Sequence, residues 1–244
     1  MADRIFEIGG AALDVTDQMA RKLIDNVVHA EVPAYRKSEV ITNSFPLELD
    51  KAMNKKSPMK PQVEDSFYSD AAGALSKTGG KLDVALGSDG FFVISGPWGE
   101  GYTRDGRFKL DKDGRLLTVA GNFPVMGQGG PVIITPGAEV EFTQSGEIKV
   151  GGIIVDSLQV VSSDKKNALE SINGAIFKRK SVNDVMLNVE NPRIIQGYVE
   201  TSNISVIDET MKQMMLEKTN SVITEFVRTR GSDLTKAIDM GRVN

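Results

Sequence analysis

The hydrophobic positions of the chain define a helical segment at each end. Apolar residues recur there every three or four positions, which is typical of amphipathic helices. The positions concerned are Ile5, Ile8, Val15, Met19, Leu23 and Val27 near one end, and Ile207, Met211, Met214, Val222 and Phe226 near the other. A single apolar stripe cannot bury itself. We therefore expect the two stripes to pair with each other, or with copies from neighbouring subunits, as a coiled coil or helical tube.

The limits of both helices can be predicted from breaker residues. The first should run from Arg4 to Ala30, because Pro33 disfavours helical geometry in the residue before it. The second should run from Val206 to Arg230 and be interrupted at residues 231–233, where the sequence is Gly-Ser-Asp. Together, residues 1–31 and 205–244 form the expected terminal helical assembly domain.

The segment from 81 to 204 has a different pattern, in which short apolar runs alternate with turn dipeptides. The turn dipeptides include Asp89-Gly90, Asp105-Gly106, Asp113-Gly114 and Gly129-Gly130. Asp-Gly supplies the positive φ values that tight hairpin turns require. The expected strands are 82–86, 91–95, 107–110, 115–119, 123–126, 132–135, 139–143, 147–150, 153–161, 175–178 and 186–189. We expect an antiparallel meander, followed by an extended return segment over 192–202.

Residues 32–80 join the first helix to this β-rich body. They are polar and rich in Pro and Gly, which indicates an extended connector with one short helix near 45–53. The predicted fold is thus mainly β with paired α-helical termini: an antiparallel β-rich central domain flanked by amphipathic helices.

Composition narrows the class of function. The chain has 244 residues, 40% hydrophobic and 25% charged, with a formal net charge of -4. These values are ordinary for a globular protein and argue against nucleic acid or anionic lipid as a partner. No stretch approaches the roughly 20 apolar residues that span a bilayer. The first residues lack the basic and apolar regions of a cleavable signal, so an extracytoplasmic location would need another export route.

Candidate chemistry is sparse. The chain has no cysteine and one histidine, His29, which we interpret as a polar helix-end residue and not as a catalytic or metal-binding group. Asp111-Lys112-Asp113-Gly114 resembles the start of a calcium loop but lacks the Glu at its twelfth position, so a β-turn is favoured. Trp98 can contact a glycan or partner, or pack over its own hairpin. We expect no catalytic, metal or cofactor site.

Three landmarks resemble the rod and hook family of bacterial flagellar axial proteins. The first covers residues 78–93, 102–108 and 113–116, the second 196–204, and the third 26–36. Their signature positions are Asp83, Gly90, Phe91, Phe92, Tyr102, Thr103, Arg104, Gly106, Gln196, Gly197, Tyr198, Ser202 and Asn203. The landmarks follow the family's order, and the length favours a rod protein, distal or proximal, over the longer hook protein. Two departures are His29 and Ala34, where the family usually has Asn and Gly.

The resemblance implies a noncatalytic subunit of the flagellar basal body. Such proteins polymerise into a hollow rod across the periplasm, with the terminal helices lining the tube, and transmit torque. The implied partners are copies of the chain, other rod or hook subunits, ring (bushing) proteins around the rod and the type III export apparatus, which needs no cleaved signal. Two other hypotheses are a secreted adhesin or glycan-binding protein that uses Trp98, and a hydrolase built on scattered carboxylates.

Overall fold

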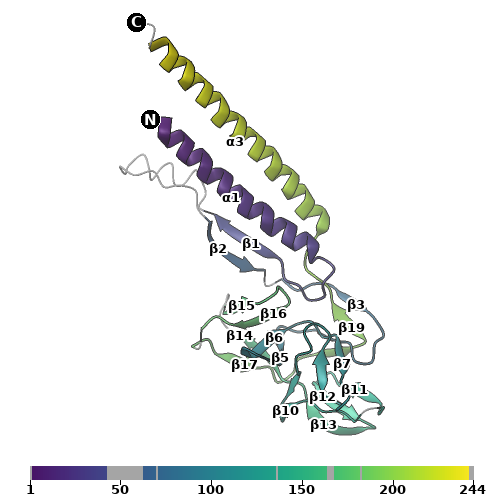
Figure 1. Ribbon diagram of the computed structural model, residues 1–244. Coiled ribbons are helices and arrows are strands. Elements are labelled where there is room, and N and C mark those ends of the chain that lie inside the picture. The colour runs from purple at the N-terminus through teal and green to yellow at the C-terminus, as the bar shows by residue number, and fades with distance from the viewer. Residues whose placement is uncertain are drawn as a thin grey trace. The chain divides into compact units, whose positions relative to one another are not determined.

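The computed structural model describes residues 2–42, 63–69, 71–135, 137–163, 168–181 and 183–241. The expected short helix at 45–53 lies outside these residues. The chain divides into two compact units (Figure 1). Residues 1–28, 38–67 and 205–244 form the first, here called the helical unit; residues 29–37 and 68–204 form the second, called the β unit.

The helical unit contains α1 (Ala2–Val28), α3 (Val206–Gly241), β1 (Ser38–Thr42) and most of β2 (Val63–Tyr68). The two helices lie side by side and run in opposite directions (Figure 1). Helix α1 ends two residues before the predicted limit. The Ser205 hydroxyl accepts a hydrogen bond from the Asp208 amide at 3.3 Å and caps the start of α3.

The predicted interruption of the second helix at 231–233 is wrong, because α3 continues to Gly241. A single glycine costs a helix only about 1 kcal/mol relative to Ala. The Ser232 hydroxyl donates to the Thr229 carbonyl at 2.9 Å, a bond made within the helix that does not compete with it. Gly231 also lies beside Phe6 of α1. Tertiary packing therefore outweighs the local breaker signal.

The segment expected to be an extended connector contains regular structure. Strands β1 and β2 pair as a two-stranded sheet, and β3 (Leu75–Lys77) pairs antiparallel with β19 (Tyr198–Glu200). These strands are polar and lack the alternation that marks a half-buried strand. Their stability comes from backbone pairing with distant segments, which a local pattern does not reveal.

The β unit holds the remaining strands in several small sheets. Their bounds are β4 (Val84–Leu86), β5 (Phe91–Gly96), β6 (Gly99–Thr103), β7 (Phe108–Leu110), β8 (Leu116–Thr118), β9 (Met126–Gly127), β10 (Gly130–Pro131), β11 (Val140–Phe142), β12 (Glu147–Val150), β13 (Ile153–Ser157), β14 (Val160–Ser163), β15 (Leu169–Ser171), β16 (Ile176–Arg179), β17 (Met186–Asn188) and β18 (Ile194–Gln196). The largest sheet has the order β15-β16-β6-β5-β14-β17.

This order shows that the prediction of a meander is wrong. Strand β14 pairs with β5 and β16 pairs with β6, although more than 60 residues separate each pair in sequence. The predicted strand at 153–161 is two strands in different sheets, β13 and β14. Trp98 lies in the turn of a tight hairpin between β5 and β6. The sequence pattern missed β6 because this strand contains two glycines.

The core of the β unit combines buried apolar side chains with a close crossing of two backbone segments, at Gly106 and Val84. Its fully buried side chains include Phe92, Ile94, Leu116 and Ile148. At Gly106, the Val84 amide donates to the glycine carbonyl at 3.0 Å. A Cβ atom at Gly106 would lie only 1.7 Å from the Val84 carbonyl oxygen. A residue without a side chain is therefore required at this crossing.

We predict that Gly106→Ala destabilises the β unit by about 1–3 kcal/mol, because the backbone must shift to admit the methyl group. Urea unfolding followed by circular dichroism measures the change. Gly129→Ala is the matched control: its Cβ would lie 3.7 Å from Asp156, an ordinary contact. Equal stability losses in the two variants would contradict the argument.

Candidate assembly site

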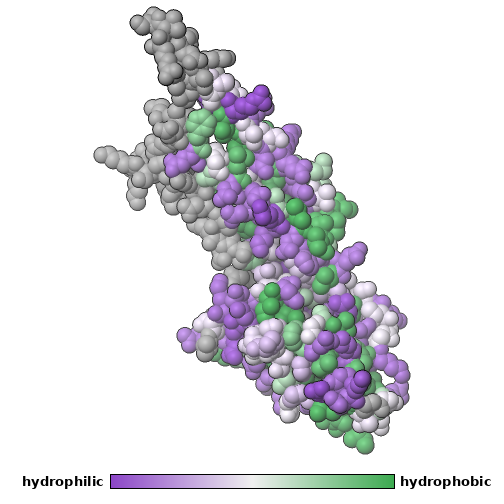
Figure 2. All heavy atoms as spheres, in the orientation of Figure 1, coloured by the Kyte–Doolittle hydropathy of each residue, from purple (hydrophilic) through white to green (hydrophobic). Residues whose placement is uncertain are grey.

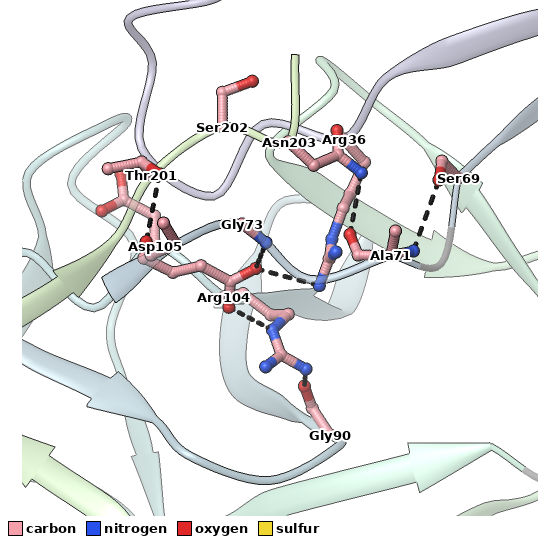
Figure 3. Close-up of polar contacts among 12 residues, drawn as sticks. Arg36, Ser69, Ala71, Gly73, Gly90, Arg104, Asp105, Thr201, Ser202 and Asn203 are labelled. Carbon is pink, nitrogen blue, oxygen red and sulfur yellow. Dashed lines mark hydrogen bonds and ion pairs between the residues drawn. The ribbon is translucent and has the colours of Figure 1, made fainter. Parts of the chain in front are cut away.

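The β unit contains a buried ion network centred on Glu200, the last residue of β19. The Glu200 carboxylate lies 2.6 Å from Arg104 Nε and 3.1 Å from an Arg36 guanidinium nitrogen. All three side chains are nearly inaccessible to solvent. Figure 3 shows Arg36, Arg104 and the Gly73 amide converging on this carboxylate. Buried charges are tolerated only when paired and hydrogen-bonded, so the network requires all its members to be in place.

The network joins segments that are far apart in sequence. Arg104 also donates to the carbonyls of Gly90 at 2.9 Å and Ser88 at 3.1 Å. The Gly73 amide donates to the Glu200 carboxylate at 2.9 Å, and the Ala34 amide donates to the Glu200 carbonyl at the same distance. Segments near residues 34, 73, 90, 104 and 200 are thereby held together.

Ala34 adopts a φ of 57°, in the left-handed region that favours glycine. This conformation gives a physical reason for the glycine that the family usually has at this position. The Ala34 side chain is buried, and its amide is held by Glu200.

Several signature residues hold backbone segments together. The Gln196 side-chain amide donates to the carbonyls of Lys81 at 2.6 Å and Val140 at 3.1 Å, and its oxygen accepts from the Phe142 amide. The Gly197 amide donates to the Asp83 carbonyl at 2.7 Å. The second landmark therefore packs against the first.

The remaining signature residues support the core and the return segment. The Thr103 hydroxyl donates to the Ala175 carbonyl at 2.8 Å. Asn203 accepts from the Lys37 amide at 2.7 Å and donates to the Ala71 carbonyl at 2.8 Å. Positions with packing or turn roles are Phe91, Phe92 and Tyr102 in the two core clusters, Tyr198 in β19, and Ser202, whose hydroxyl accepts from the Ile204 amide.

The predicted α1 stripe lies largely against other residues of the helical unit. Val15 is buried, and Ile8, Met19, Leu23 and Val27 are half-buried. The side chain of Ile5 lies outside the described residues.

The predicted α3 stripe is exposed in the single chain. Ile207, Met211, Met214, Val222 and Phe226 are between 51% and 74% accessible. The residues of α3 that are covered occupy another face: Glu209, Gln213, Leu216, Asn220, Ile223 and Val227. Figure 2 shows apolar side chains at the surface of the helical region, among hydrophilic ones. The exposed stripe is hereafter called the outward face of α3, with the neighbouring Met215 included.

Sequence reasoning did not single out four of the most informative residues: Arg36 and Glu200 in the β unit, and Asn26 and Glu209 in the helical unit. The Asn26 side-chain amide donates to Glu209 at 2.9 Å and to the Ser38 carbonyl at 2.9 Å. Polar residues in a helix or strand are usually exposed, so no local pattern marks these as buried. The available sequence signals were the acidic first turn of α3, which includes Glu209, and the landmark segments 26–36 and 196–204, which contain the other three residues.

The other candidates have structural explanations. The His29 ring stacks on Tyr35 with 4.9 Å between centroids. Trp98 packs on Phe123 over its own hairpin, again at 4.9 Å. The Gly114 amide donates to the Asp111 carbonyl at 3.2 Å, which closes the expected β-turn, and the Asp111 carboxylate accepts from the amides of Asp113 and Arg115. Among the described residues, no three acidic or histidine side chains form a group that could hold a metal ion. No helix in that part of the chain is long and apolar enough to cross a membrane.

Comparison with known proteins agrees with this architecture. Residues 85–150 match the family model of the flagellar hook protein FlgE/F/G D1 domain. The flagellar basal-body rod protein FlgF of Rhizobium meliloti is 28% identical over 94% of this chain and 96% of its own length. FlgF of Caulobacter vibrioides is 25% identical over 90% of this chain and 91% of its own. The rod protein FlgG of Buchnera aphidicola from Acyrthosiphon pisum is 28% identical, with 67% of this chain and 66% of its own covered.

The chain is therefore similar to flagellar basal-body rod proteins over most of its length, and the predicted resemblance is confirmed. Its similar relatives are named as flagellar basal-body rod proteins. Those names describe a structural component and no enzymatic activity.

We predict that Glu200→Gln destabilises the β unit by roughly 3–5 kcal/mol, because two buried arginines lose their counter-charge. Urea unfolding measures the loss. The control is Glu170→Gln, which removes an exposed ion pair to Lys178 of 3.4 Å and should cost less than about 1 kcal/mol. A loss at Glu200 no larger than that at Glu170 would refute the central role of the network.

A second prediction concerns alkaline pH. Burial, with a smaller contribution from the nearby Glu100 carboxylate, raises the pKa of Tyr102 from 10.0 to about 12. When the pKa of a group is higher in the folded state than in the unfolded state, its contribution to stability is complete below the unfolded-state pKa. That contribution is lost as the pH rises through the folded-state pKa. We therefore expect Tyr102→Phe to lose less stability than the wild type between pH 10 and 12 in unfolding experiments at stepped pH. Parallel losses in both proteins would count against the shift.

Proposed function

We propose that the chain is a structural subunit of the bacterial flagellar rod, which polymerises into a helical tube that transmits torque. The observation that supports this most directly is the outward face of α3, six exposed apolar side chains on one helix of a chain similar to rod proteins. An interface between two different faces of a subunit, when it does not close on itself, generates a helical filament. The terminal helices would then line the tube.

Burial of the outward face supplies the driving force. A Met, Val, Ile or Phe side chain gains roughly 1.5–3 kcal/mol on full burial. Several such residues on one helix make a substantial contribution at every subunit contact. The partners are copies of the chain and other rod or hook subunits, with ring (bushing) proteins outside the rod. The location is the periplasmic part of the basal body, reached through the type III export apparatus without a cleaved signal peptide.

We predict that Met214→Asp abolishes polymerisation, because it places an unpaired charge in every subunit contact, at a cost of several kcal/mol each. Motility should be lost, and rods should be absent from basal bodies seen by electron microscopy. The purified variant should keep its β-rich circular dichroism, since the outward face contributes nothing to the β unit.

Thr224→Asp is the matched control. Thr224 is exposed on α3 but lies away from the outward face, so the same charge on the same helix should leave motility intact. Wild-type swimming by the Met214→Asp strain would mean that the outward face of α3 stays in solvent and that the proposed subunit contact is wrong.

A further inference from the structure

We propose that buried polar residues decide which face of α3 packs against α1, in opposition to the preference that hydrophobicity alone would impose. The inward face of α3 is defined as Glu209, Gln213, Leu216, Asn220, Ile223 and Val227. Only three of these residues are apolar. The outward face, Ile207, Met211, Met214, Met215, Val222 and Phe226, is apolar throughout.

The two faces lie on nearly opposite sides of the helix, because each residue advances by about 100°. If burial of apolar area were the only consideration, α3 would turn its outward face to α1, since more hydrophobic surface would leave water. The structure shows the reverse. A stronger, directional interaction must therefore fix the rotation of α3 about its axis.

Two buried polar contacts provide that interaction. Asn26 of α1, with no accessible surface, donates to the Glu209 carboxylate at 2.9 Å and exchanges two hydrogen bonds with the Ser38 backbone. Ten residues earlier on α1, the buried Thr16 hydroxyl hydrogen-bonds the Asn220 side chain. Rotation of α3 would separate Asn26 from Glu209 and Thr16 from Asn220, and the Thr16 hydroxyl would keep only the carbonyls of its own helix. The fully buried Asn26 amide would lose an acceptor, and a buried polar group without a partner carries its full desolvation cost.

Steric fit favours the same face. A Cβ atom at Gly9 of α1 would lie 2.6 Å from a Val227 methyl carbon, so Val227 sits directly on bare backbone. The larger Phe226 belongs to the outward face and would meet this close approach if α3 rotated. The inward face thus matches α1 by hydrogen bonding and by size, whereas the outward face matches it only by hydrophobicity.

The inference concerns the single chain and does not depend on the proposed function. It assigns Thr16, Asn26, Glu209 and Asn220 a role in specificity: they select the less apolar face of α3 for packing against α1. Buried polar residues between helices are known to select one arrangement at a cost in stability.

Disulfide cross-linking can report which face is inward, because the natural chain has no cysteine. Ala20 lies four residues after Thr16, and Leu216 lies four before Asn220, so antiparallel packing places them opposite each other. The pair Ala20→Cys with Leu216→Cys reports the inward face, and Ala20→Cys with Met214→Cys reports the outward face. Oxidation of the dilute full-length chain, with intramolecular products separated from dimers on gels, gives the ratio of the two yields.

In the chain that carries only the two cysteine substitutions, we expect the inward pair to give the higher yield of intramolecular disulfide. Adding Thr16→Val and Asn26→Leu removes the hydrogen bonds that Asn220 and Glu209 receive from α1, although Glu209 keeps its ion pair with Lys212. The inward-to-outward ratio should fall by about tenfold for each change. Adding Glu209→Leu and Asn220→Leu as well makes the inward face apolar and should restore the ratio. A ratio unchanged by Thr16→Val with Asn26→Leu would overturn the proposal.

Helix content by circular dichroism controls for unfolding. Asn26 also holds β1, so the double change can unfold the helical unit. In that case Thr16→Val alone decides the question, because it keeps every Asn26 contact. We expect its ratio to fall by about tenfold, and an unchanged ratio would again overturn the proposal. Dilute chains do not polymerise in this assay, so failure of the proposed rod function would leave the result unaffected.

Discussion

The β unit depends on the burial of one carboxylate, that of Glu200, between two buried arginines. A lone buried charge is far less favourable than a paired one, so the segments that carry Glu200, Arg36 and Arg104 stabilise one another only as a set. Backbone groups of Gly73, Ser88 and Gly90 complete the hydrogen bonding. This requirement explains why many short sheets behave as one unit, although few of their strands exceed five residues.

The helical unit follows a related rule. Apolar burial brings α1 and α3 together, but it is non-directional and would be satisfied better by the other face of α3. Hydrogen bonds made by Asn26 and Thr16 supply the missing direction. The result is a helix with two distinct surfaces, one that completes the subunit and one that remains accessible to a neighbour.

The landmark residues that resemble the rod and hook family hold backbone segments of this chain together. Gly106 permits a close backbone crossing, Gln196 joins three separate segments, and Arg104 neutralises Glu200. These residues determine a shape. In the proposed rod subunit a defined shape would matter, because an error in geometry would be repeated at every contact.

The sequence by itself determined the broad outline: two helical ends, a glycine-punctuated β region, the apolar stripe of α3 and the family resemblance. These features are encoded locally, in periodicity, turn dipeptides and contiguous motifs. Only the tertiary structure decided the strand order, the continuity of α3 through Gly231 and the burial of Glu200, Asn26 and Glu209. Each of these depends on a partner distant in sequence, such as Arg36 for Glu200, Phe6 for Gly231 or β14 for β5. Local patterns carry no information about such partners, because the free energy that selects them arises only when the segments meet.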